Sequence, residues 1–241
     1  MLKSINNEPK IPLDIYSQNL NGTSFLVESS YLGLIDYDRS LEIQNDLWSK
    51  VYKDTSQSYL LAQEHPTVMT LGLRAHHLDL KQLIVGEWGY PIVKISRGGL
   101  ATLHSPGQLV IYPIMNIRKL NLSVKDFVNL LFSTTQKTLN DYGITSHIDL
   151  CDQPGVYTSN GKIAFCGLQV KHGITLHGLS ININNDIHLF GRIQSCGILN
   201  PKIDSLEKHN ISTKVFDFYQ KWIKNFYVIP IVKSNANCDL K

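Results

Sequence analysis

A lysine and a cysteine stand at the two ends of one stretch of the sequence, Lys162 and Cys196. They are chemically complementary, because an ammonium group lowers the pKa of a nearby thiol and a neutral amine can accept a proton. A thiolate with such a partner can carry an acyl group as a thioester. We therefore treat the two residues as candidates for acyl transfer, beside the simpler interpretations of a buried small cysteine and a solvated lysine at a strand end.

The surroundings of the cysteines favour Cys196 as the nucleophile. Gly197 follows it, a short polar segment precedes it, and no periodic apolar pattern surrounds it. Cys166 ends the apolar run 163–166, where a packing role is expected. The chain has four cysteines and no Cys-x-x-Cys pair, which favours free thiols in a reducing compartment.

Residues 97–107 form the richest polar cluster, with three glycines and a proline between two expected strands. The glycines let backbone N–H groups approach an anion or a carbonyl, Arg97 adds a fork of donors, and His104 can titrate near neutral pH. An ordinary glycine-rich surface turn is the alternative. The length of the segment and its flanking strands favour a ligand-binding loop.

Several functional classes are excluded by what the sequence lacks. It contains no Gly-x-x-x-x-Gly-Lys-[Ser/Thr], no Gly-x-Gly-x-x-Gly and no His-Glu-x-x-His, so neither a nucleotide cofactor nor a metal is indicated. A net charge of +3 is too mild for a dedicated nucleic-acid binder. No apolar run could cross a bilayer and residues 1–12 lack a signal-peptide core, so we expect a cytoplasmic protein.

The pattern of apolar residues predicts the elements that must position these groups. Helices are expected at residues 38–54 and 213–226, with a third between a Ser123/Asp126 capping box and Gly143. Strands are expected at residues 24–27, 31–37, 58–63, 67–71, 90–96 and 108–115, with hairpin turns at 159–161 and 172–173.

This mixture predicts a single α+β domain with a mixed sheet packed against helices. We expect an N-terminal arm at residues 1–22, a catalytic domain at 23–231 and a polar tail at 232–241.

Short motifs along the chain resemble the lipoyl(octanoyl) transferases of lipoate biosynthesis, a family also called lipoate-protein ligase B. In order, they are Glu64-His65-Pro66 with Thr70-Leu71-Gly72, the segment 97–108, Pro154-Gly155-Val156-Tyr157, Gly161-Lys162-Ile163-Ala164, His177-Gly178-Leu179-x-Ile181-Asn182 and Cys196-Gly197. The sequence departs from the family pattern at Ser105, at Ser195 and at residues 151–153. These departures put loop flexibility and one basic contact in doubt, but they leave the lysine and the cysteine in place.

The resemblance implies a fold like the catalytic domain of biotin and lipoate protein ligases, with helices on one side of the sheet. It implies that Cys196 is the acyl-thioester nucleophile and that Lys162 lowers its pKa. The residues implied to line the acyl site are Arg97, Gly98, Gly99, Leu100, Ala101, Thr102, Leu103, His104, Phe165, Cys166, Gly167, Gly178, Leu179 and Ser180.

The implied activity is transfer of an octanoyl group from octanoyl-acyl carrier protein, through the cysteine thioester, to a lysine of lipoyl domains. The implied acceptors are the lipoyl domains of 2-oxoacid dehydrogenases and the glycine cleavage H protein. No cofactor, nucleic acid or membrane is implied, and a monomer is expected. An ATP-dependent ligase of the same fold would instead need nucleotide contacts and no cysteine at position 196. A non-catalytic acyl-binding protein would need neither member of the pair.

Overall fold

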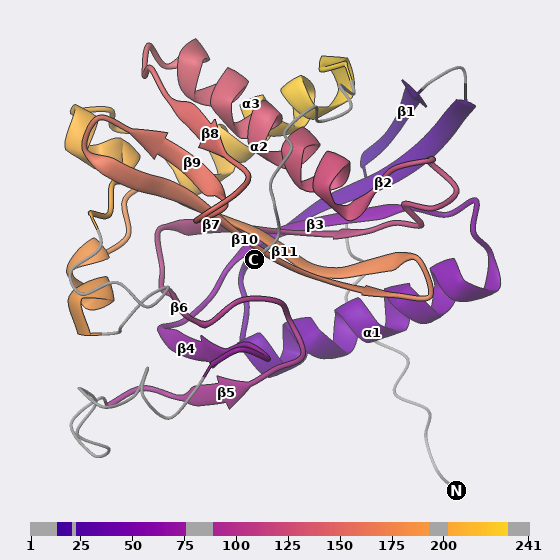
Figure 1. Ribbon diagram of the computed structural model, residues 1–241, viewed down its shortest axis with the longest axis horizontal. Coiled ribbons are helices and arrows are strands. Elements are labelled where there is room, and N and C mark those ends of the chain that lie inside the picture. The colour runs from indigo at the N-terminus through magenta and orange to yellow at the C-terminus, as the bar shows by residue number, and fades with distance from the viewer. Residues whose placement is uncertain (1–13, 21–22, 76–88, 193–201, 231–241) are drawn as a thin grey trace, which may run out of the picture.

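An eight-stranded mixed sheet forms the centre of the protein (Figure 1). The computed structural model describes residues 14–20, 23–75, 89–192 and 202–230. Neighbouring strands are antiparallel except β2 and β3, which are parallel. In spatial order the strands are β1 (Asp14–Leu20), β2 (Thr23–Leu34), β3 (Tyr59–Glu64), β7 (Gln108–Ile114), β11 (Ile174–Asn182), β10 (Gly161–Lys171), β9 (Gly155–Thr158) and β8 (His147–Asp149).

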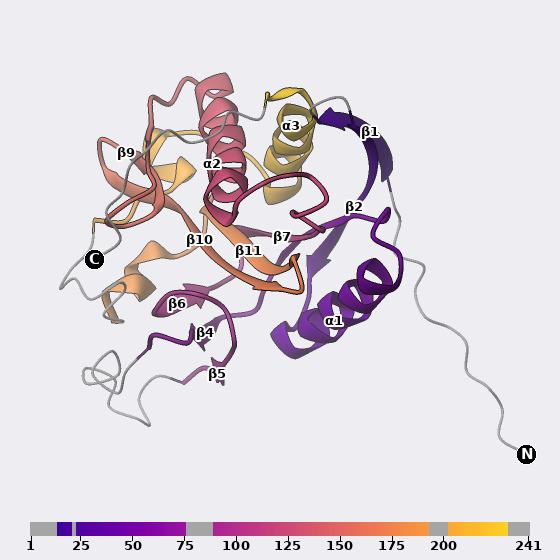
Figure 2. The ribbon, with the colours of Figure 1, turned by 45° about the vertical axis from the view of Figure 1, so that its right-hand side comes forward.

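Helices cover both faces of this sheet (Figures 1 and 2). Helices α2 (Val124–Asp141) and α3 (Val215–Val228) pack on one face, where the largest apolar cluster includes Phe127, Leu131 and Trp222. Helix α1 (Tyr37–Lys53) packs on the opposite face through a second cluster around Leu47 and Val51. The α+β fold is confirmed, but the expectation of helices on one side is wrong, because the buried stripe of α1 faces β7 and β11 on the other side.

The local signals around α2 and the hairpins are confirmed. The Ser123 hydroxyl accepts from the backbone N–H of Asp126, whose side chain accepts from the N–H of Ser123 in return, and this capping box begins α2. The β9–β10 hairpin turns at Asn160, and β10–β11 turns at His172, which has a positive φ of 54°. Asparagine, histidine and glycine tolerate such turns better than most residues.

The N-terminal strands differ from the sequence prediction. Residues 14–20, expected in the arm, form β1, and β2 runs without a break through residues 28–30. Ser29 and Ser30 are buried, and β2 pairs with β3 at these positions. The sequence prediction left residues 28–30 between two separate strands, but their backbone groups belong to a parallel ladder formed with a distant strand.

A second, three-stranded sheet lies between β3 and β7 in the chain (Figure 1). It consists of β5 (Ile92–Lys94), β4 (Val68–Leu71) and β6 (Ala101–His104), in that spatial order. The expected binding loop at 97–107 therefore contains a strand, β6. This small sheet lies on the same side of the main sheet as α1 and brings Arg97 to the middle of β10 (Figure 2).

Candidate active site

Lys162 is buried at the beginning of β10, with 6% of its surface exposed. Its ammonium nitrogen donates a hydrogen bond of 3.3 Å to the carbonyl oxygen of Gln153. The same nitrogen lies 5.4 Å from the ring centre of Tyr157 and 5.1 Å from that of Phe165. A lysine held among aromatic rings and away from water is not a solvated strand end, which was the simpler interpretation.

Gly155 on β9 leaves the space that the Lys162 side chain occupies. A Cβ atom at position 155 would overlap the Cε atom of Lys162 and lie 2.8 Å from the carbonyl oxygen of Ala164 and 3.0 Å from the lysine nitrogen. Any larger residue at 155 would therefore displace the lysine or separate β9 from β10.

An apolar cluster lies beside Lys162 on the face of β10 that carries Phe165. Phe165 and Phe190 stack with their ring centres 5.4 Å apart. Phe190 belongs to the short helix η2 (Ile187–Arg192). The buried members of this cluster, which we call the small apolar cluster, are Met69, Leu71, Ala101, Leu103, Phe165, Phe190 and Ile203.

Cys196 and Ser195 lie outside the described residues, but the described residues on both sides of them contact the Lys162 region. Before them, Phe190 stacks on Phe165. After them, the N–H of Lys162 donates to the carbonyl oxygen of Lys202 at 2.8 Å, and Ile203 forms a bridge with Lys162. Both described ends of the chain that flank residues 193–201 thus lie at the beginning of β10.

The Arg97 side chain is buried and bound to other protein groups. Its guanidinium donates to the carbonyl oxygen of Thr70 at 2.7 Å, to the Thr70 hydroxyl at 3.0 and 3.2 Å and to the carbonyl oxygen of Gly98 at 2.9 Å. The N–H of Gly98 donates to Leu168 on β10 at 3.1 Å. Arg97 therefore fixes the small sheet against β10, a role that the glycine-rich pattern did not indicate.

His104 is a neutral hydrogen-bonding residue in this fold. Burial lowers its pKa to about 3, with a further contribution from His65, so the expectation that it titrates near neutral pH is wrong. Its Nδ1 lies 2.7 Å from the Gln108 side-chain oxygen. Because that oxygen can only accept, Nδ1 carries the proton and Nε2 is an acceptor.

The implied lining residues on β10 and β11 divide between the two faces of the main sheet. Phe165 pairs with Ser180 and Gly167 with Gly178, whereas Cys166 pairs with Leu179. Cys166 and Leu179 pack in the large cluster with α2 and α3, on the face opposite to Phe165. Side chains alternate along a strand, so a continuous segment cannot line one site with every residue. Thr70, Gly155 and Tyr157 belong to the matched motifs but were given no role, and Phe190 belongs to none of them. The roles of these four residues arise from tertiary contacts.

The cysteines differ in chemical state. Cys166 is a free thiol, and burial raises its pKa to about 12 despite the favourable charge of Lys162. A thiol with such a pKa is a poor nucleophile at neutral pH. Cys151 is disulfide-bonded, so the expectation that all four cysteines are free is wrong at that position.

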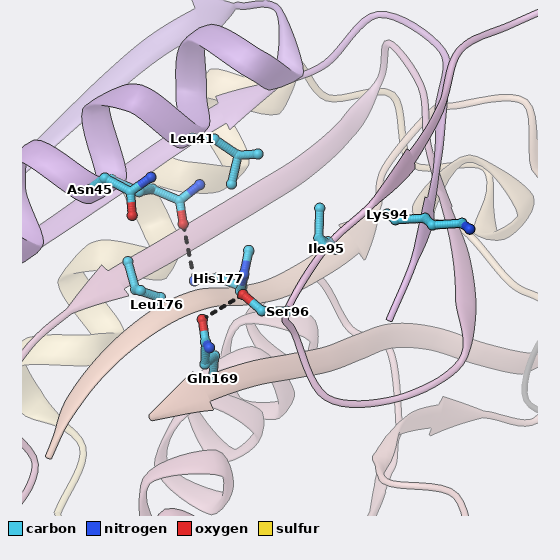
Figure 3. A pocket seen from close by; sticks show the side chains of 9 residues that line it. Leu41, Asn45, Lys94, Ile95, Ser96, Gln169, Leu176 and His177 are labelled. Atoms are coloured by element: carbon cyan, nitrogen blue, oxygen red, sulfur yellow. Dashed lines mark hydrogen bonds between the residues drawn. The ribbon is translucent and has the colours of Figure 1, made fainter. Parts of the chain in front are cut away.

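A small pocket of about 230 Å³ lies between α1, residues 94–96 and the β10–β11 pair (Figure 3). A hydrogen bond of 2.9 Å from the Ser96 hydroxyl to Gln169 lies at its side. Gln169 follows the point where Gly98 binds Leu168, so the pocket lies farther along β10 from Lys162 than that contact. We therefore assign the chemistry to Lys162 and not to this pocket.

Three buried histidines near the Arg97 loop make stability depend on pH. Burial lowers the pKa of His65 to about 4, of His104 to about 3 and of His177 to about 4. In the unfolded chain, histidines take up protons near pH 6.5. The contribution of the three buried histidines to the free energy of unfolding is therefore fully present above that pH and is lost as the pH falls. We expect the free energy of unfolding to fall by up to about 1.4 kcal/mol per pH unit per histidine between about pH 6 and 5.

Urea unfolding at pH 7, 6 and 5 measures this dependence. His177→Asn, which suits the positive φ of 57° at that position, should reduce the slope by about one third. Exposed His188→Asn is the matched control and should leave the slope unchanged. Equal slopes in all three proteins would exclude His177 as a cause of the pH dependence.

Two structural tests concern metal and membrane binding. Within the described residues, no group of three or more His, Cys, Asp or Glu side chains could hold a metal ion. In the same part of the chain, no helix is both long and apolar enough to cross a bilayer.

Comparison with known proteins identifies similar sequences. The family described as "Lipoyl protein ligase A/B catalytic domain" matches residues 36–227. A protein of Syntrophobacter fumaroxidans named "Octanoyltransferase" is 35% identical over 179 residues, which cover 73% of this chain and 78% of that protein. One of the same name from Cellvibrio japonicus is 39% identical over 174 residues, which cover 71% of this chain and 77% of that protein.

Solved structures show the same fold at low sequence identity. Lipoate-protein ligase A bound with ATP superposes with a TM-score of 0.62 and 11% identity, covering 80% of this chain and 81% of that one. The bipartite lipoate protein ligase from Thermoplasma acidophilum gives a TM-score of 0.61 and 12% identity, covering 80% of each chain. At this identity the likeness shows the architecture alone.

Proposed function

The chain belongs to the lipoyl protein ligase A/B catalytic domain family, and on this basis we propose that it transfers an octanoyl group to lipoyl domains. The relatives named octanoyltransferase support this reaction class. The proposed donor is octanoyl-acyl carrier protein, and the proposed acceptor is a lysine of a lipoyl domain. The observation that carries the proposal is the buried Lys162 beside an apolar cluster. The residues before the Cys196 segment contact its neighbour Phe165, and those after the segment contact Lys162 itself.

The number of residues between Cys196 and its described flanks is compatible with a Cys196–Lys162 pair. Cys196 is six residues from Phe190, which stacks on Phe165, and six residues from Lys202, which binds the backbone of Lys162. Six residues span at most about 20 Å when fully extended. The number of residues on each side therefore permits Cys196 to reach the Lys162 region.

The proposed reaction has two balanced half-reactions. The Cys196 thiolate attacks the donor carbonyl, the bond from carbon to the pantetheine sulfur breaks, and the leaving sulfur takes a proton from Lys162. The acceptor amine then attacks the enzyme thioester and gives its proton to the neutral Lys162, while the Cys196 sulfur leaves as thiolate. Conversion of a thioester to an amide lowers the free energy, so the two half-reactions need no ATP.

The acyl chain has a matching apolar surface beside Lys162. The small apolar cluster begins at Phe165, next to the ammonium group, and continues to Leu103 on β6 and Met69 on β4. We propose that the octanoyl chain lies against this cluster, between β10 and the segment Arg97 to His104. Its methylene groups would each gain about 0.8 kcal/mol on leaving water.

Intact-mass measurement after incubation with octanoyl-acyl carrier protein, without ATP, tests the proposal. We expect a mass increase of about 126 Da that hydroxylamine removes, followed by loss of the adduct when a lipoyl domain is added. The protein should first be reduced with a phosphine, because Cys151 is disulfide-bonded. Transfer that occurs only with ATP and free octanoate, and without an adduct, would favour the ligase reaction instead.

A further inference from the structure

The backbone of Lys162 is held on both sides by the residues that follow the Cys196 segment. The N–H of Lys162 donates to Lys202 at 2.8 Å, and its carbonyl oxygen accepts from the N–H of Asp204 at 2.9 Å. Gly161 permits this approach, because a Cβ atom there would overlap the carbonyl oxygen of Lys202. The position of Lys162 therefore depends on residues 202–204.

Asp204 is the centre of a buried polar network. Its side chain has no exposed surface, and its Oδ2 accepts from the Thr158 hydroxyl and lies 2.6 Å from Nε2 of His209. Its backbone carbonyl accepts from the Asn182 side chain at 2.9 Å. Three elements thus converge on one residue: the end of β9, the last strand β11 and the short helix η4 (Leu206–His209).

The carboxylate is expensive to bury in this position. Its second oxygen, Oδ1, is buried and has no hydrogen-bond partner. An incompletely satisfied buried carboxylate costs several kcal/mol of desolvation, and a neutral residue of similar size could avoid that cost. Stability alone therefore does not account for an aspartate here.

The network also reaches the other side of the candidate site. The Asn182 side-chain oxygen accepts from Gln108 at 2.9 Å, and the Gln108 oxygen accepts from His104 at 2.7 Å. A continuous path of hydrogen bonds therefore connects His104 beside the Arg97 loop with Asp204 beside Lys162. Both walls of the site are fixed to the same buried network.

We propose that Asp204 is a positioning residue for Lys162, acting with Thr158 and His209. This inference rests on the proposed function, because it assigns Asp204 a part in that reaction through Lys162. The carboxylate holds residues 202–204 against β10, which sets where the lysine side chain begins. An asparagine oxygen could accept both hydrogen bonds, but asparagine lacks the negative charge that strengthens them, and its amide NH2 would take the place of Oδ1, which has no hydrogen-bond partner.

The test compares Asp204→Asn with wild type in octanoyl transfer. We expect kcat to fall about tenfold or more, KM for octanoyl-acyl carrier protein to change less than about twofold, and the acidic limb of the pH–rate profile to move upward. Thr158→Ser, which keeps the hydroxyl donor, should retain activity, and Thr158→Val should behave like Asp204→Asn. If Asp204→Asn does not fold, the two Thr158 variants decide the question.

The matched control is Asn225→Ala in α3. Asn225 donates to Thr138 and Asp141 of α2 at 3.1 and 2.7 Å, so its loss also breaks a buried polar contact, but between helices on the other face. It should lower the melting temperature without moving the pH profile. An Asp204→Asn protein that loses stability alone, with unchanged kcat and pH profile, would overturn the positioning role.

A second measurement separates this inference from the proposed function. Lys162 is buried and should react slowly with a lysine-directed acylating reagent, and Asp204→Asn should label at Lys162 about fivefold faster or more. Unchanged labelling would overturn the inference even if wild type transfers octanoyl groups. Faster labelling in a protein without transferase activity would instead leave the positioning role standing and remove the proposed reaction.

Discussion

Replacing Cys196 with serine should abolish octanoyl transfer, lowering kcat by about a thousandfold or more. The alcohol has a pKa far above neutrality, and one nearby ammonium group cannot ionise it. The octanoyl adduct that forms on incubation with octanoyl-acyl carrier protein should be absent from the intact-mass spectrum of this variant. A variant that still transfers at a comparable rate would show that another residue is the nucleophile.

Cys166→Ser is the matched control for that experiment. Cys166 is also a free thiol, and the charge of Lys162 acts to lower its pKa. Burial outweighs this effect and raises the pKa to about 12. The residue packs against the large apolar cluster. The variant should form the adduct and retain most activity, with any loss accompanied by lower stability. An adduct that maps to Cys166 in wild type would transfer the assignment to the opposite face of β10.

Lys162→Arg should lower kcat by about a hundredfold or more, because guanidinium keeps the charge but cannot release its proton at neutral pH. The two half-reactions should respond differently. Acylation of Cys196 should persist at a reduced rate, whereas transfer to the lipoyl-domain amine should be lost. Rapid-quench measurement of the two single turnovers distinguishes them.

Two further variants control for size and charge. Gly155→Ala keeps the lysine but fills the space beside its Cε atom, so it should also impair both steps. Exposed Lys50→Arg should have no effect. Near-normal turnover in Lys162→Arg would mean that charge alone is required and that the general base is another group. His104 would not be a suitable general base in place of Lys162, since its pKa of about 3 makes it a very weak base.

Much of the fold followed from local sequence signals. The Ser123/Asp126 capping box and the turns at residues 159–161 and 172–173 predicted α2 and two hairpins, because each depends on residues close in sequence. Helix α1 was placed within a residue or so at each end. Its buried stripe contains Ser40 and Gln44, however, whose partners are 23 and 133 residues away. Such polar core contacts have no local signal.

The candidate site was predictable in its chemistry more than in its contacts. The types and order of the motif residues indicated Lys162, and the structure shows that this lysine is buried. Arg97 was interpreted as a ligand donor because its partner, Thr70, is 27 residues earlier in the chain. Asp204 gave no signal at all, because a single aspartate before a short helix is common and its burial is a property of the folded chain.

The direct pairing of β3 with β7 allows the small sheet to vary separately from the main one. The chain leaves the main sheet after Glu64 and returns to the neighbouring position at Gln108, and the described residues between them, 65–75 and 89–107, belong to none of its strands. Insertions or exchanges in this excursion could reshape the wall that faces the acyl chain while every strand of the main sheet keeps its register. If the proposed function holds, acyl chain-length preference and the lysine proposed for proton transfer belong to separable parts of one protein, the small sheet and the main sheet.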